Sequence, residues 1–122
     1  MSAISAVIPT SRLKQPVKQT HGVDPVTSLV VRDEPAFLRG LRVTNNTDVA
    51  GFVQVHNAAA VPSSGAKPLD AWPLPANGMV DAEFDPESPI YGTTGLTIVI
   101  SSTLSIYTAS SNAALVIAYS SI

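Results

Sequence analysis

Two histidines are the residues of this chain best suited to acid–base chemistry, and neither lies in a catalytic motif. A nucleophilic site needs a base that can activate a nearby serine, threonine or cysteine. The 122-residue chain has no cysteine and no Gly-x-Ser-x-Gly turn. His21 lies in an N-terminal segment, and His56 precedes Asn57 at the end of a strand-like run. We therefore expect His56 to lie at the rim of the fold and to bond to the backbone, and the sequence predicts no catalytic residue.

A group of acidic residues between positions 81 and 87 is the next candidate for chemistry. Carboxylate oxygens of this kind could bind a hard cation such as Ca²⁺. The spacing lacks the glycine-containing pattern of a calcium loop, and it is too irregular for the paired carboxylates of a glycosidase. Neither a P-loop nor a Gly-x-Gly-x-x-Gly motif is present. We interpret the group as a solvated strand face and predict no metal, no cofactor and no enzymatic activity. Its members are Asp81, Glu83, Asp85 and Glu87.

The composition describes one domain with an unusually uncharged surface. Hydrophobic residues make up 45% of the chain and charged residues only 13%, against roughly 25% charged in an average globular protein. Such a surface suits a protein that lies against partners, although an ordinary secreted-type β domain with a hydroxyl-rich surface is the alternative. The net charge of −2 gives no case for nucleic-acid binding.

No apolar run approaches the roughly 20 residues that are needed to cross a bilayer, so no membrane partner is expected. The apolar stretch of the N-terminus precedes its basic residues, which is the wrong order for a signal peptide. Synthesis in the cytoplasm is therefore the expectation.

Residues 1–25 differ from the rest and are expected to form an extended N-terminal arm. Pro9, Pro16 and Pro25 forbid a continuous helix. Ala3 to Ile8 could add a short strand to a neighbour or to the edge of the chain's own sheet, and a disordered tail is the alternative. The apolar and basic side chains of this arm, together with the single tryptophan, are the candidate partner-binding residues: Ile4, Val7, Ile8, Arg12, Lys14, Lys18 and Trp72.

The stretch from Leu41 to His56 is expected to form a central β-hairpin. Leu41 and Val43 alternate with polar residues, which is typical of a half-buried strand. The polar residues 45–48 supply turn chemistry, and Val53 and Val55 mark the core face of a second strand. Just before this stretch, Gly40 indicates a β-bulge.

Further strands are expected over residues 26–32, 79–84, 95–102 and 113–121, with residues 103–107 continuing in an extended conformation. Residues 95–102 are apolar on both faces, which favours a central, covered strand. Asn77-Gly78 favours a type I′ hairpin. Trp72 lies between prolines and is expected to cap the core, with an interface anchor as the alternative. Seven or eight strands and no convincing helix predict an all-β fold over residues 26–122, a Greek-key or jelly-roll-like β-sandwich.

Several motifs resemble a domain that recurs in structural proteins of tailed bacteriophages. They cover more than half of the chain and lie between Leu41 and Thr108. They are Val53-Gln54-Val55-His56-Asn57-Ala58, Val61-Pro62-Ser63-Ser64-Gly65-Ala66-Lys67-Pro68, Tyr91-Gly92-Thr93-Thr94-Gly95-Leu96, Ser101-Ser102-Thr103 and Tyr107-Thr108.

The resemblance implies a virion structural protein that acts by binding. The expected role is a capsid decoration (cement) protein on the outside of the head, which binds across junctions of the major capsid protein and forms dimers or trimers. The base domain of a tail or head fibre, or a receptor-binding component, is the alternative. A small hydrolase or lectin-like enzyme, suggested only by His56 and the acidic strand, is a third possibility.

Overall fold

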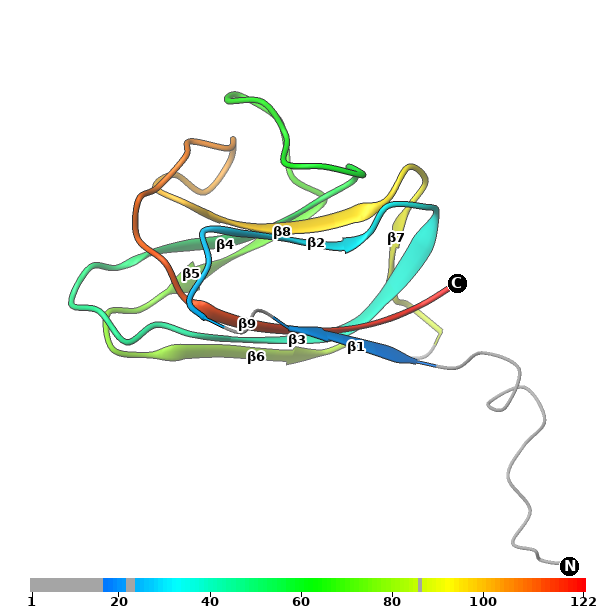
Figure 1. Ribbon diagram of the computed structural model, residues 1–122, viewed down its shortest axis with the longest axis horizontal. Helices are drawn as coiled ribbons and strands as arrows, with labels where there is room; N and C mark the ends of the chain where they lie inside the picture. Colours follow the sequence, from blue (N-terminus) through cyan, green and yellow to red (C-terminus); the bar gives the residue numbers. More distant parts are fainter. Residues whose placement is uncertain (1–16, 22–23, 86) are drawn as a thin grey trace, which may run out of the picture.

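The computed structural model describes residues 17–21, 24–85 and 87–122, and these residues form two antiparallel sheets packed face to face (Figure 1). No helix occurs among the described residues. The prediction of an all-β sandwich is confirmed. The first sixteen residues, which include Ile4, Val7, Ile8, Arg12 and Lys14, lie outside the described part of the chain.

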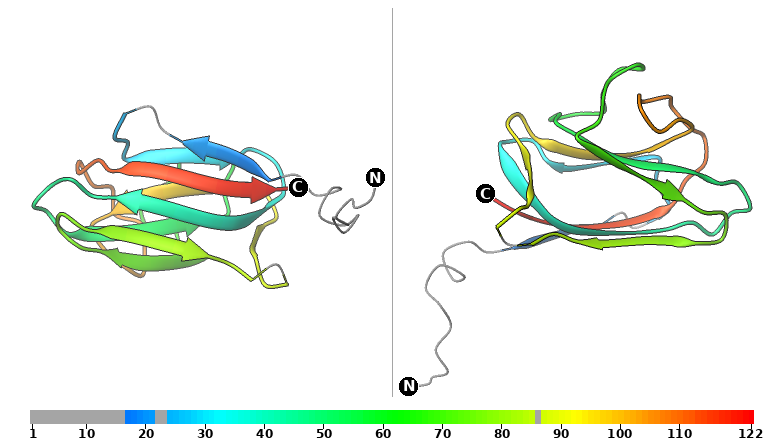
Figure 2. Two further views of the ribbon diagram at one scale, coloured as in Figure 1. Left: turned by 90° about the horizontal axis from the view of Figure 1, so that it is seen from below. Right: turned by 180° about the vertical axis from the view of Figure 1, so that it is seen from behind.

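The described residues form nine strands, which are divided between the two sheets. In the first sheet β1 (Lys18–His21), β9 (Leu115–Ser121), β3 (Ala36–Thr44) and β6 (Met79–Glu83) lie in this order, and β7 (Ile90–Gly92) pairs with the first part of β3. In the second sheet the order is β2 (Ser28–Arg32), β8 (Leu96–Ser101), β4 (Gly51–His56) and β5 (Asp70–Leu74). Figure 2 shows the strands of the first sheet side by side.

The strand pairs are nested along the chain. β4 pairs with β5, and outside this pair β3 pairs with β6, β2 with β8 and β1 with β9. Consecutive pairs alternate between the two sheets. The chain is therefore a long antiparallel ribbon that wraps around a single core.

The core consists of the inward side chains of both sheets, and every strand except β1, β6 and β7 contributes at least one buried member. From β6, Val80 and Ala82 pack against the core while Asp81 and Glu83 are exposed, as their alternation predicts. β8 is buried along its whole length, which confirms the prediction of a central, covered strand. The buried core residues are Val31, Ala36, Leu38, Leu41, Val43, Val53, Val55, Leu74, Leu96, Ile98, Ile100, Ala114, Val116 and Ala118.

The predicted hairpin from Leu41 to His56 is wrong, because its two strands lie in opposite sheets. Asn45, which is 1% exposed, donates from Nδ2 to the carbonyl oxygens of Val49 (2.9 Å) and Pro75 (3.0 Å). Its Oδ1 accepts from the backbone N–H of Thr47 at 3.0 Å. Turn-forming residues such as Asn45 are also found in hairpins. In this protein they stabilise a connection that crosses from one sheet to the other.

The predicted Asn77-Gly78 hairpin is also a crossing between sheets, since it joins β5 to β6. Asn77 does adopt a positive φ of 50°. The two crossings are bonded to each other, from Asn45 N–H to the carbonyl of Gly78 and from Asn77 N–H to the carbonyl of Thr47, both at 2.8 Å. They close one end of the sandwich together.

Two further local predictions have opposite outcomes. The bulge near Gly40 is confirmed, because Leu38 and Gly40 are paired with the consecutive residues Ser120 and Tyr119. Residues 103–107 are expected to be extended, but the chain forms a series of bends over residues 102–106 instead. At the N-terminal side, Lys18 to His21, assigned to the arm from the sequence, adds β1 to the edge of the first sheet.

The turn before β8 depends on close backbone packing at Gly95. A Cβ added there would lie 2.6 Å from the carbonyl oxygen of Arg32 and 2.8 Å from that of Ala58. Both neighbours are backbone atoms of other segments, so they cannot rotate away. The site therefore excludes any side chain.

We predict that Gly95→Ala lowers the free energy of unfolding by about 2–3 kcal/mol, because the methyl group overpacks this contact. Thr94→Ala is the matched control, since Thr94 is exposed in the same turn, and it should change stability by less than about 0.5 kcal/mol. Urea unfolding of both variants measures the difference. Equal stability of the two variants would show that the turn can move apart.

Candidate functional site

The outer face of the second sheet is buried under two loops. In Figure 1 the loops 57–69 and 102–113 rise above β4 and β8, on the side away from the first sheet. Gln54 and His56, which point to this side from β4, are 0% and 2% exposed. The expectation that His56 lies at the rim and bonds to the backbone is wrong, because the side chain is buried under the two loops and its Nε2 lies against the side chain of Gln54.

The side-chain amide of Gln54 holds the 102–113 loop in place. Its Nε2 lies 2.9 Å from the carbonyl oxygen of Thr103, 3.0 Å from that of Leu104 and 2.9 Å from that of Ile106. Two N–H hydrogens are thus shared among three acceptors. A buried amide that bonds to three loop carbonyls replaces the hydrogen bonds of a regular strand in this loop.

These contacts also determine that the Nε2 atom of His56 carries a proton. Because Nε2 of Gln54 is surrounded by acceptors, Oε1 of Gln54 is the atom that faces His56, at 2.8 Å from its Nε2. Oε1 can only accept a hydrogen bond, so Nε2 of His56 carries the proton and donates it. The imidazole of His56 therefore helps to hold the side-chain amide of Gln54 in its orientation.

Tyr107 joins the two loops over this network. Its ring is 7% exposed and meets the His56 ring edge-on, with centroids 5.7 Å apart. Its backbone N–H donates to the carbonyl of Ala66, and its carbonyl accepts from the N–H of Gly65, both at 2.8 Å. The 57–69 and 102–113 loops therefore form one unit, which we call the loop platform.

The loop platform presents apolar side chains to solvent. Val61 is 50% exposed, and Leu104 and Ile106 are each 43% exposed. The backbone of Leu104 and Ile106 is fixed by Gln54, so their side chains are displayed in a defined geometry. Among all residues of the two loops, Lys67 carries the only charge at neutral pH. The platform is thus a rigid surface with a single charged residue and exposed apolar groups.

The predicted site residues that the structure describes do not come together. Lys18 is exposed on β1, at the edge of the first sheet. Trp72 is half-buried on β5, where it packs against the core with its ring centroid 6.0 Å from that of Phe84. This packing agrees with the expected core cap. The role of both residues in binding a partner stays a prediction.

The acidic residues do not form a metal site within the described part of the chain, where no group of three or more potential ligands occurs. Asp81 pairs with Arg42 at 3.0 Å on the outer face of the first sheet. Oδ1 of Asp85 accepts from the backbone N–H of Glu87 in a turn. The part of the chain that the structure describes also holds no helix that is long and apolar enough to cross a membrane.

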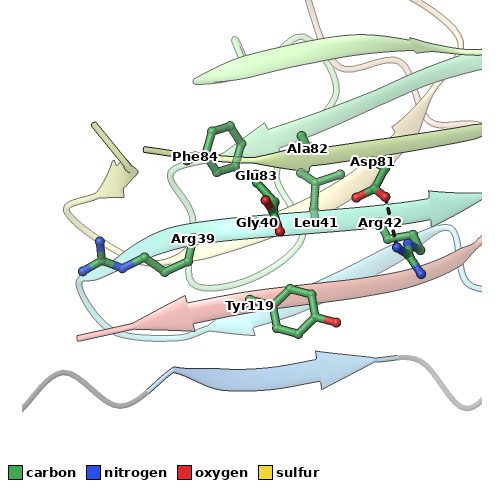
Figure 3. A pocket seen from close by; sticks show the side chains of 9 residues that line it. All are labelled: Arg39, Gly40, Leu41, Arg42, Asp81, Ala82, Glu83, Phe84 and Tyr119. Atoms are coloured by element: carbon green, nitrogen blue, oxygen red, sulfur yellow. Dashed lines mark hydrogen bonds and ion pairs between the residues drawn. The ribbon is translucent and has the colours of Figure 1, made fainter. Parts of the chain in front are cut away.

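A groove on the outer face of the first sheet is the second candidate site. It has a volume of about 510 Å³ and lies over β3, β6 and β9 (Figure 3). Its walls mix aromatic and charged side chains, with Tyr119 on β9, Glu83 on β6 and Arg42 on β3. No local pattern indicates this groove, because the residues that line it come from three segments far apart along the chain.

Comparison of the chain with protein-family models, with curated proteins and with solved structures finds no match. The functional proposal therefore rests on the fold, its surfaces and the residue motifs.

Burial lowers the pKa of His56 from its ordinary value of 6.5. The unfolded chain then binds a proton on this residue more readily than the folded chain does. The resulting stability is fully present above pH 6.5 and is lost as the pH falls from 6.5 through the lower pKa of the folded state. The maximum slope for one proton is about 1.4 kcal/mol per pH unit.

We predict that the free energy of unfolding of the wild-type protein falls between pH 7.5 and pH 5, and that His56→Gln removes most of this dependence. Glutamine keeps an N–H donor near Oε1 of Gln54 and does not titrate. His21→Gln is the matched control, because His21 is exposed on β1, and it should keep the wild-type slope. Urea unfolding at several pH values gives the slopes, and an undiminished slope in His56→Gln would contradict the assignment.

Proposed function

We propose that this protein is a capsid decoration protein of a tailed bacteriophage, which binds across junctions between major capsid protein subunits and stabilises the head without catalysis. The observation that carries the proposal is the loop platform. Its apolar side chains are exposed on a backbone that Gln54 holds rigid. A surface that is already ordered binds without the entropic cost of ordering its loops.

The wrapping of the chain supports the same proposal. We infer a jelly-roll form of the sandwich, which is supported by the nested pairs β4–β5, β3–β6, β2–β8 and β1–β9 that alternate between the two sheets. Jelly rolls occur in viral capsid proteins and also in lectins and cupins. The motifs that resemble phage structural domains favour the virion among these alternatives. The segments that match include parts of both loops of the platform.

The size of the platform's apolar contribution fits a protein that works in many copies. Complete burial of one Leu or Ile side chain is worth roughly 1.5–3 kcal/mol. Because each side chain is 43% exposed, burial of the exposed part of Leu104 and Ile106 together would contribute about 1–3 kcal/mol to each contact. Many such contacts on one shell add up through multivalency. Dimers or trimers at symmetry axes, and added contacts from residues 1–16, belong to the same proposal.

The base domain of a fibre, or a receptor-binding component, is the second candidate, and the groove on the first sheet favours it. A groove of mixed chemistry on the face opposite the platform could contact a host molecule. The two candidates differ in copy number, because a head carries a decoration protein in hundreds of copies and fibres in far fewer.

We predict that quantitative mass spectrometry of purified virions finds hundreds of copies of this chain per particle, comparable with the major capsid protein. A handful of copies would point to the fibre or tail candidate. Absence from the virion would overturn both.

The platform itself is tested with Leu104→Ser/Ile106→Ser, which should lower the affinity for heads that lack the protein by roughly tenfold to a hundredfold. The melting temperature should stay near that of the wild type, because both side chains face solvent. Val49→Ser is the matched control, since Val49 is 55% exposed on a crossing between the sheets, away from the platform. Equal binding of the double variant and the control would show that another face meets the shell.

A further inference from the structure

The register of the first sheet places a gap in the middle of one row of outward side chains. Across the strands, Gln19 on β1 is paired with Tyr119 on β9, Tyr119 with Gly40 on β3, and Gly40 with Glu83 on β6. Gly40 has no side chain, so the row is open between Tyr119 and Glu83. The groove described above lies over this gap.

The gap is maintained by backbone packing as well as by the glycine. A Cβ added at Gly40 would lie 3.1 Å from the carbonyl oxygen of Ala82 and 3.7 Å from Cδ2 of Tyr119. The first of these contacts is tighter than ordinary van der Waals contact, and the second is ordinary. The bulge at Arg39 sits at the same place and sets this register between β3 and β9. The fold therefore leaves a defined depression here.

The two sides of the gap have different chemistry. Figure 3 shows the ring of Tyr119 broadside over β9 and the side chain of Glu83 extending from β6 toward Gly40. Tyr119 is 39% exposed. In the next row Arg42 and Asp81 form an ion pair at 3.0 Å, with side chains 53% and 46% exposed. A ligand in the gap would thus contact an aromatic face, a carboxylate and a guanidinium group.

This combination of groups selects a neutral ligand with many hydroxyls. A cationic ligand is disfavoured by the guanidinium of Arg42, and an anionic ligand by Glu83 and Asp81. A wholly apolar ligand would leave the carboxylates and the guanidinium desolvated without partners. The hydroxyls of a sugar ring can donate to Glu83 and accept from Arg42, while its C–H face packs on Tyr119. The volume lies within the range of roughly 300–1,000 Å³ that is typical of small-molecule sites.

We propose that the groove over Gly40 is a saccharide-binding site, with Tyr119 as the stacking platform and Glu83 and Arg42 as hydrogen-bonding partners. The site lies on the face of the sandwich opposite the loop platform. It goes beyond the proposed function and does not depend on it, because binding of sugars is measured on the isolated protein.

The test is binding of the full-length protein to an array of neutral di- to tetrasaccharides built from glucose, galactose, mannose and N-acetylhexosamines. The strongest binder is then titrated by NMR. Tyr119→Ala should weaken binding by roughly tenfold or more through loss of ring contact, and Glu83→Gln by a similar factor through loss of a charged acceptor. Tyr91→Ala is the matched control, because Tyr91 is a 45% exposed tyrosine on the same sheet that does not line the groove, and it should bind like the wild type.

Chemical-shift changes should be centred on Gly40, Glu83 and Tyr119. Failure of every saccharide to bind, or equal weakening by Tyr119→Ala and Tyr91→Ala, would overturn the proposal. An arginine-containing peptide is included as a competitor, since a cationic side chain is the other group that stacks on tyrosine. Binding of the peptide but of no saccharide would assign the groove to a protein partner and would also overturn the proposal.

Discussion

The structure depends on one requirement. The polar side chains on the outer face of β4 and β8 are buried, so they need hydrogen-bond partners within the protein. β4 and β8 are buried on both faces, and their outward side chains include Gln54, His56, Thr97 and Ser101. A buried polar group without a partner costs roughly 1–3 kcal/mol. The loops meet this requirement: Thr97 donates to the carbonyl of Ala58, and Ser101 accepts from the N–H groups of Thr103 and Thr108. The two loops are therefore held in place because they form hydrogen bonds with the buried polar side chains of β4 and β8.

The same constraint makes the two faces of the sandwich unequal. On the second sheet the loops cover the strands and turn apolar side chains outward. On the first sheet no loop of comparable length covers the strands among the described residues (Figure 2). Outward side chains such as Arg42 and Glu83 are therefore exposed. One face is therefore suited to a broad contact with another protein, whereas the other offers a small groove shaped by strand register. Two kinds of recognition can coexist on one module because they use opposite layers.

Features that depend on local alternation of side chains are predicted from the sequence. Features that depend on which distant segment packs against a strand are not. The two-sided burial of residues 96–101 and the bulge near Gly40 follow from side-chain pattern and from glycine alone. The hairpin prediction failed because the turn residues after Val43 are equally suited to a hairpin and to a crossing between sheets. The burial of His56 was missed because alternate polar residues normally mark a solvent face. The prediction that residues 96–101 form a strand covered on both faces also implies that a neighbouring strand is covered. No local pattern identifies β4 as that neighbour.

The groove is a second feature that local sequence patterns do not predict. No pattern along the chain links Tyr119, Gly40 and Glu83 to one another, and only the pairing of β9, β3 and β6 brings them into one row. A slip of one residue in either pairing would move Tyr119 or Glu83 to the core face of the sheet. In the adjacent row Leu41 is paired with Ala118, which is buried, and with Ala82, which is partly buried against the core, and these residues specify the register. The hydrophobic core thus determines which polar and aromatic groups meet on the surface, so selection for a stable sandwich also maintains the geometry of the groove.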